Sequence, residues 1–300
     1  MMMVYLLMVI CVLVSVAFIT LLERKILGYI QYRKGPNKLG IMGIFQPFAD
    51  AVKLLFKDNS ILLGGNKIIF YFSPCLSFIL MLLLWMIIYW VVEVGFMYEI
   101  MIFILISSLG VYALLGAGWA SNSKYALLGA YRGIAQMISY EISLSFIILC
   151  IFLMSMGFKL EKILFLQSSM WLMFGMWNLF LLWLVTILAE TNRTPFDFSE
   201  GESELVSGFN IEYGSGGFVM LFLAEYGNII YMSLITSYMF MGGVGIYCWK
   251  TLLLILFYLF IRGTLIRYRY DSLMMLGWKV ILPYSIFNLL IFFMVFIFSI

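Results

Sequence analysis

The run MVYLLMVICVLVSVAFITLL, residues 3–22, contains twenty consecutive apolar or hydroxyl-bearing residues and no charge. A helix needs about 20 such residues to cross the roughly 30 Å hydrocarbon core of a bilayer. No basic segment precedes the run and no small-residue cleavage site follows it. We therefore predict a permanent membrane span here and not a removable leader.

The rest of the chain has the same character. Hydrophobic residues make up 65% of its 300 residues and charged residues only 11%, whereas about a quarter of a soluble domain is charged. This composition predicts an all-α polytopic membrane protein, with residues 1–300 forming a single membrane domain. Eight transmembrane helices are predicted, at Met3–Leu22, Ile68–Val92, Ile100–Trp119, Tyr131–Met156, Met170–Ala189, Phe218–Met241, Thr251–Ile266 and Val280–Ile297.

The first connection, residues 23–67, is basic and carries eight of the eighteen Lys and Arg residues. Within it, Ile41–Phe56 places apolar residues at helical spacing and keeps Asp50, Lys53 and Lys57 outside that stripe. This pattern predicts an amphipathic helix lying in the membrane interface. Two interpretations stay open: a lid over a lipid-facing opening, or an ordinary surface helix packed on the bundle.

The distribution of charge supports the span count. With eight spans, the connections after the first, third, fifth and seventh lie on one side, and they carry fifteen of the eighteen bases. The positive-inside rule assigns that side to the cytoplasm, or to the matrix of a mitochondrion. If one span had been missed, the bases would be distributed over both sides of the membrane and this asymmetry would be lost.

The connection after the fifth span, residues 190–217, is an acidic exception on that basic side and begins ETNRTPFDFSEGESEL. Residues 190–225 hold one base, Arg193, and seven of the fifteen carboxylates. Thr194 as N-cap followed by Pro195 predicts a short helical turn. The seven carboxylates are Glu190, Asp197, Glu200, Glu202, Glu204, Glu212 and Glu225.

Two carboxylates, Glu141 and Glu225, fall inside predicted spans. A charge at the bilayer centre costs roughly 2.5–3.5 kcal/mol on insertion scales, so retained charges usually face the bundle interior or a wet cavity. A structural ion pair with an arginine is one interpretation. The closeness of Glu190 and the acidic connection favours the other, a proton or charge relay.

Several chemistries are not expected of this chain alone. Its four cysteines are far apart in apolar runs, and it has no histidine, which disfavours a zinc site, a haem or an iron–sulfur cluster. No glycine-rich nucleotide motif follows a strand-like run. We therefore expect no metal site, no catalytic residue acting alone and no nucleic-acid partner.

Six motifs carry a resemblance to a known family. They are ERKILGY (residues 23–29), RKGPN (33–37), QPFADAVK (46–53), GWASNSKYA (118–126), AETNRTPFD (189–197) and EGESELVSGFNIEY (200–213). The chain resembles, essentially from end to end, the chain 1 family of mitochondrial NADH-ubiquinone oxidoreductase, respiratory complex I. Its composition is similar to that of arthropod members.

The resemblance implies a multi-pass protein of the mitochondrial inner membrane, with spans two to six resembling half an antiporter-type subunit. The expected partners are the peripheral quinone-site subunits, small membrane-arm subunits and lipids. FMN and the iron–sulfur clusters would belong to other subunits. Ubiquinone would enter from the bilayer between the first span, the amphipathic helix and the sixth span, and be reduced in a neighbouring subunit.

The resemblance also implies residue roles. The quinone passage and the charged network beside it would include Arg24, Arg33, Phe222, Arg193 and Arg267. The proton or charge relay would comprise Glu141, Glu190, Asp197, Glu200, Glu202, Glu204 and Glu225.

We hypothesise that quinone reduction changes the protonation of Glu200, Glu202 and Glu204, because like charges this close cannot all ionise cheaply. The change would pass through Glu190 and Glu141 to pumping subunits. Two alternatives are a membrane subunit of a related hydrogenase and a proton-coupled transporter. The transporter would need a pair of matching Gly- or Pro-broken spans, which we do not find. A structural anchor would leave the buried acids unexplained.

Overall fold

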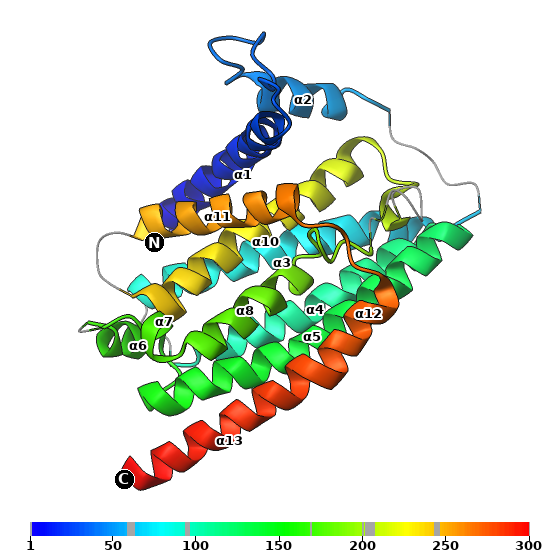
Figure 1. Ribbon diagram of the computed structural model, residues 1–300. Helices are drawn as coiled ribbons and strands as arrows, with labels where there is room; N and C mark the ends of the chain where they lie inside the picture. Colours follow the sequence, from blue (N-terminus) through cyan, green and yellow to red (C-terminus); the bar gives the residue numbers. More distant parts are fainter. Residues whose placement is uncertain are drawn as a thin grey trace.

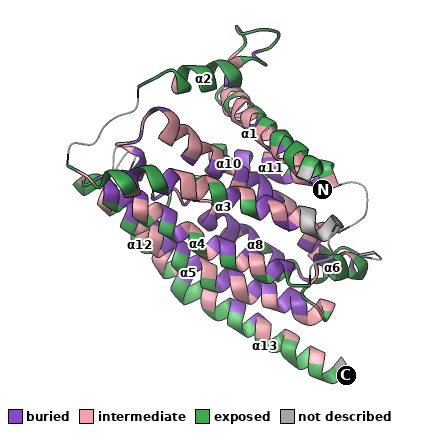
Figure 2. Ribbon diagram, turned by 180° about the vertical axis from the view of Figure 1, so that it is seen from behind, coloured by how far each residue is buried: buried purple, intermediate pink, exposed green. Residues whose placement is uncertain are grey.

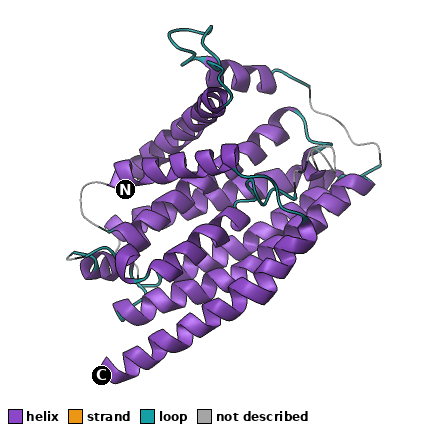
Figure 3. Cartoon of the chain, viewed as in Figure 1, coloured by secondary structure: helices purple, strands orange, loops and turns teal. Residues whose placement is uncertain are grey.

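The protein is seen in a computed structural model that describes residues 2–58, 64–93, 97–168, 170–199, 201, 208–242 and 247–299. Every regular element in these ranges is a helix (Figure 3). The long helices are α1 (Met2–Ile30), α3 (Lys67–Glu93), α4 (Glu99–Ala120), α5 (Lys124–Ser155), α8 (Trp177–Glu190), α10 (Ser215–Thr236), α11 (Tyr247–Thr264) and α13 (Leu282–Ser299). The short ones are α2 (Gln46–Leu55), α6 (Leu160–Leu166), α7 (Leu172–Gly175), α12 (Tyr270–Met275), the 3-10 helix η1 (Gly208–Asn210) and the π-helices η2 (Ser237–Met241) and η3 (Leu276–Ile281).

Seven helical stretches are long and apolar enough to cross a membrane among the described residues, and α8 is a shorter apolar helix of 14 residues. At 1.5 Å per residue α8 is only about 21 Å long, short of the hydrocarbon thickness. The all-helical membrane fold is thus confirmed. Seven spans plus the shorter α8 are consistent with the predicted eight.

Successive long helices run in opposite directions. Figure 1 shows the described parts of the connections from α1 to α3, α4 to α5, α8 to α10 and α11 to α12 at one end of the bundle, toward the right and top, and both chain termini toward the other. We call these the inner and outer ends, because the inner connections are the predicted basic ones. The alternation therefore matches the arrangement on which the charge argument depends.

The core lies around α5. Its most apolar stretch is 56% buried, against 17% for α1 and for the stretch from α12 to α13. The helix α3 packs on α4 and α10, α4 on α5, and α5 on α8 and α13. Figure 2 shows α1 and α13 at the edges of the bundle with largely exposed or half-buried residues. Exposed apolar side chains are normal for helices that face lipid or partner helices.

The first span is longer than predicted. The helix α1 continues from Met2 to Ile30, whereas the apolar run ends at Leu22. Glu23 therefore lies on the helix and is buried, although the sequence placed it in the connection. The reason is tertiary, because the bundle supplies partners for its charge.

The predicted amphipathic helix is present as α2 but begins at Gln46, not at Ile41. Gly40 and Gly43 precede it with φ of 67° and 80°, a left-handed conformation that breaks a helix. Its apolar residues Phe48 and Val52 remain 44% and 51% exposed. An interfacial helix needs such an uncovered apolar side, whereas a helix packed on the bundle would bury it.

The helical turn predicted at Thr194 is wrong. Residues 191–199 form turns and bends, and the Thr194–Pro195 peptide bond is cis. The Phe196 N–H donates to the Arg193 carbonyl at 2.7 Å. Phe196 and Phe198 are buried in the core, and this packing outweighs the local capping pattern.

Candidate functional site

A buried group of charges joins α1, the acidic connection, α10 and α11 near the inner end. Glu23 Oε1 forms an ion pair with Arg262 and lies 3.9 Å from Arg193 Nη1. The Tyr226 hydroxyl donates to Glu23 Oε2 at 2.7 Å. The Arg193 guanidinium also lies over the Tyr226 ring, 4.4 Å from its centre. We call these four residues the Glu23 cluster.

The Glu23 cluster is held away from solvent in the chain itself. The side chains of Glu23 and Arg193 are only 7% and 14% exposed, and that of Arg262 is 30% exposed. One carboxylate faces two guanidinium groups in this cluster. A buried carboxylate requires compensation, which these guanidinium groups and the Tyr226 hydroxyl supply.

An aromatic row on α10 leads to this cluster. Phe222 stands one helical turn from Phe218, with ring centres 4.2 Å apart, and one turn from Tyr226, with ring centres 6.3 Å apart. The helix α10 packs on both α1 and α2. Phe222 is therefore joined through Tyr226 to Arg193 and Glu23.

A second feature is a cavity of about 100 Å³ between α3, α4, α10 and the end of α8. Its polar lining includes Glu190, Asn192, Glu225 and Asn228, and the remainder is mostly apolar. We call it the Glu190 cavity. It brings together two of the predicted relay carboxylates from the ends of an acidic stretch more than thirty residues long.

The Glu190 cavity is suited to water. Glu190 Oε2, Asn192 Oδ1 and Asn228 Oδ1 have no hydrogen-bond partner among the residues that the structure describes. A buried polar atom without a partner costs about 1–3 kcal/mol. Only about 10–15 Å³ of such space admits one water molecule, so this volume has room for several. Water bridging these oxygens would connect the two carboxylates.

Gln136 of α5, which sequence reasoning missed, positions Glu190. It is fully buried, and its Nε2 donates to the carbonyls of Ala189 and Phe196, each at 2.8 Å. Ala189 directly precedes Glu190 at the end of α8. One amide thereby ties α5 to both ends of the turn that carries Arg193.

We expect Gln136→Leu to destabilise the assembled protein. The change removes the side-chain donor that the Ala189 and Phe196 carbonyls share and leaves them only the longer bonds from the Asn192 and Phe198 N–H groups, at 3.3 and 3.1 Å. Each lost hydrogen bond is worth about 0.5–1.5 kcal/mol. Thermal denaturation in detergent should show a lower midpoint, with faster protease cleavage in residues 191–199. The exposed Gln31, in the turn after α1, offers the matched control Gln31→Leu. Equal midpoints for the two variants would contradict the positioning role.

The other predicted relay residues take different places. Glu141 on α5 is half-buried and within electrostatic range of Glu190, but it does not line the Glu190 cavity. Asp197 lies in the turn after Pro195, outside the same lining. Glu200, Glu202 and Glu204 lie outside the described residues.

The predicted passage arginines are also separated. Arg24 Nη1 binds Asp50 Oδ2 at 2.6 Å and so ties α1 to α2. Arg33 is exposed in the connection after α1. Arg267 lies over the Phe198 ring, 5.1 Å from its centre, and a Cβ on Gly201 would collide with its guanidinium. Arg267 thus adjoins the acidic connection, whereas Arg24 contacts α2.

Sequence reasoning missed the partners of this site more than its acids. Glu23, Tyr226 and Arg262 carry no local sign that they meet, because they belong to α1, α10 and α11. A signal was available for two others. Gln136 and Asn228 are amides inside apolar spans, where a polar side chain is costly and therefore usually has a partner or a function.

Known proteins match this chain over almost its whole length. Residues 3–293 match a family model described as NADH dehydrogenase. The chain is 50% identical over 292 residues to NADH-ubiquinone oxidoreductase chain 1 of Aedes aegypti, covering 96% of this chain and 93% of that protein. It is 51% identical over 293 residues to that of Anopheles gambiae, with the same coverage of 96% and 93%. For the protein of that name from Lampetra fluviatilis, identity is 46% over 292 residues, or 94% of this chain and 91% of that protein.

Proposed function

The chain belongs to the NADH-ubiquinone oxidoreductase chain 1 family of respiratory complex I subunits, and on that premise we propose that it lines the ubiquinone passage and couples quinone reduction to proton translocation. It is a subunit of an oxidoreductase and a multi-pass membrane protein. We place it in the mitochondrial inner membrane, with its basic inner end toward the matrix. FMN and the iron–sulfur clusters would be held by other subunits of the complex.

The observation that carries the proposal is the continuity of two features near the inner end. The aromatic row from Phe218 to Tyr226 ends on the Glu23 cluster. On the same helix α10, Glu225 and Asn228 line the Glu190 cavity. An apolar quinone tail suits the row, and the guanidinium groups of Arg193 and Arg262 would stabilise a quinone headgroup that gains electrons nearby.

The relay would run on the other side of α10. Reduction of the headgroup would change the field at Arg193, which directly follows the cavity-lining Thr191 and Asn192 in the chain. A proton could then redistribute among Glu225, Glu190 and the cavity water. Glu141, within electrostatic range of Glu190, would carry the change toward α5. Each of these steps is electrostatic and needs no redox group in this chain.

Family membership also bears on the alternatives. The relatives share about half of their residues with this chain over nearly their whole length, and they are named as ubiquinone oxidoreductase subunits. No feature of the described structure favours a hydrogenase subunit or an independent transporter over this assignment.

Photolabelling of the intact complex tests the passage. We expect a ubiquinone with a photoreactive group on its tail to label peptides of α1, α2 and α10, including the stretch around Phe222. Excess unmodified ubiquinone should suppress this labelling, because both compounds would occupy one path. The helix α13 at the opposite edge of the bundle is the internal control. Labelling of α13 as strong as that of α10, or labelling that resists competition, would refute the passage.

A further inference from the structure

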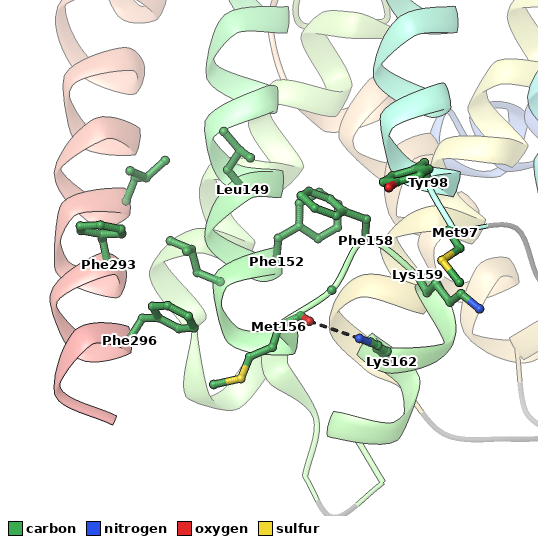
Figure 4. A pocket seen from close by; sticks show the side chains of 13 residues that line it. Met97, Tyr98, Leu149, Phe152, Met156, Phe158, Lys159, Lys162, Phe293 and Phe296 are labelled. Atoms are coloured by element: carbon green, nitrogen blue, oxygen red, sulfur yellow. Dashed lines mark hydrogen bonds between the residues drawn. The ribbon is translucent and has the colours of Figure 1, made fainter. Parts of the chain in front are cut away.

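An apolar cavity lies at the outer end, away from the Glu23 cluster. It has a volume of about 810 Å³, within the usual range of about 300–1,000 Å³ for ligand sites. Its walls are the last turns of α5, the outer half of α13 and the segments that begin α4 and α6. Figure 4 shows Phe293 and Phe296 projecting from α13 toward α5, which contributes Leu149 and Phe152.

The lining is apolar except at its mouth. Phe152 and Phe158 form an edge-to-face pair with ring centres 4.9 Å apart. Lys159 and Lys162 stand at one side of this wall (Figure 4). The Lys162 Nζ donates to the Met156 carbonyl at 3.3 Å and is otherwise exposed.

The two lysines are unusual for their position. The outer end has only three of the chain's eighteen bases, Lys159, Lys162 and Lys250. Lys250 is buried and donates to the carbonyls of Met241 and Gly242. The other two bases of that end therefore both line this one cavity. The exposed Glu161 between them in sequence is not part of the lining.

The acidic side chain at the start of α4 does not line this cavity. Glu99, the acid at the start of α4, is buried, and its Oε2 accepts from the Leu160 N–H at 3.0 Å. It lies within electrostatic range of Lys159 but does not line the cavity. The mouth therefore presents two ammonium groups beside an apolar space.

We propose that this cavity holds an acyl chain of an anionic phospholipid, whose phosphate binds Lys159 and Lys162. An acyl chain needs no hydrogen-bond partner, and the apolar walls offer few. An ammonium beside the membrane surface attracts anionic lipid in preference to a zwitterionic one. The choice of lipid over a partner helix rests on this charge complementarity.

The test uses the assembled complex in phosphatidylcholine nanodiscs with a small fraction of phosphatidylglycerol carrying a photoreactive acyl chain. We expect cross-links to peptides that contain Phe152 and Phe293. Lys159→Gln and Lys162→Gln should each lower this labelling about five-fold, the effect expected for one lysine near an anionic surface. The exposed Lys57 at the inner end supplies the control Lys57→Gln, which should leave labelling unchanged.

Competition separates a lipid from a free phosphate. Unlabelled phosphatidylglycerol should displace the probe, whereas glycerol phosphate, which has the headgroup chemistry without a chain, should not. Three results would overturn the proposal: equal labelling by a photoreactive phosphatidylcholine, labelling unchanged in both lysine variants, or cross-links from the cavity walls to a segment of a partner subunit. The first and third can be read in the unmodified complex, so the test does not depend on assembly of the variants.

Discussion

Glu190→Gln should nearly abolish proton translocation by the assembled complex and slow quinone reduction with it. The glutamine side chain has almost the same shape, so it still fills the Glu190 cavity beside Asn192 and Asn228. It cannot gain or lose a proton, however. Positioned proton transfer typically contributes about 10²–10⁴-fold to a rate, and we expect a loss at least at the lower end of that range.

The measurement is made in proteoliposomes, where NADH oxidation and acidification of the lumen are followed together. The exposed Glu161 at the outer end offers the same chemical change at a solvated position, and Glu161→Gln should pump normally. Glu190→Asp keeps the carboxylate and should recover part of the activity, which a purely structural role would not explain. If Glu190→Gln and Glu141→Gln both leave quinone reduction and pumping intact, the relay is wrong.

Glu23→Gln should prevent stable assembly of the complex. The change removes the carboxylate that pairs with Arg262 and lies 3.9 Å from Arg193. Removing one member of a buried ion pair costs about 3–5 kcal/mol, because the remaining charge is uncompensated. Such a loss is a large fraction of the roughly 5–15 kcal/mol net stability of a typical folded protein. The amount of intact complex on a native gel should fall sharply.

A double variant separates this explanation from simple loss of packing. Glu23→Gln combined with Arg262→Gln removes one charge of each sign and should assemble better than Glu23→Gln alone. Coupling of this kind is expected for residues in direct contact. The exposed pair of Arg269 and Asp271 is the matched control, and Asp271→Asn should change assembly little, because surface ion pairs contribute about 0–1 kcal/mol. Normal assembly of the single Glu23 variant, or no rescue by the second change, would contradict the role of the cluster.

The membrane fold and the family were predictable because the sequence signals for both lie in contiguous residues. Hydrocarbon excludes unpaired backbone groups, so each span must close its own hydrogen bonds as a helix. A run such as residues 3–22 therefore predicts a helix without reference to the rest of the chain. Motifs such as ERKILGY and AETNRTPFD are likewise continuous, and the family resemblance that they carried, including that to arthropod chains, is confirmed.

Element ends were less predictable, for two different reasons. The helix α1 passes beyond its apolar run to Ile30 because the bundle neutralises Glu23. The turn after Thr194 matched a helix N-terminus, but the burial of Phe196 and Phe198 and the bonds from Gln136 hold it in another conformation. In the second case tertiary contacts outweigh a local capping preference that is worth about 1 kcal/mol.

What the sequence determined by itself was the set of membrane helices, the basic inner end and the presence of acids where hydrocarbon should exclude them. Which groups meet those acids was decided only by tertiary structure. Glu23 and Tyr226 share a hydrogen bond across 203 positions of the chain, and Glu190 and Glu225 share a cavity because α8 ends beside α10. The physical reason is that a helix forms from bonds within its own residues, whereas a buried charge is stabilised by whatever partners the packing of distant helices brings within a few ångströms of it.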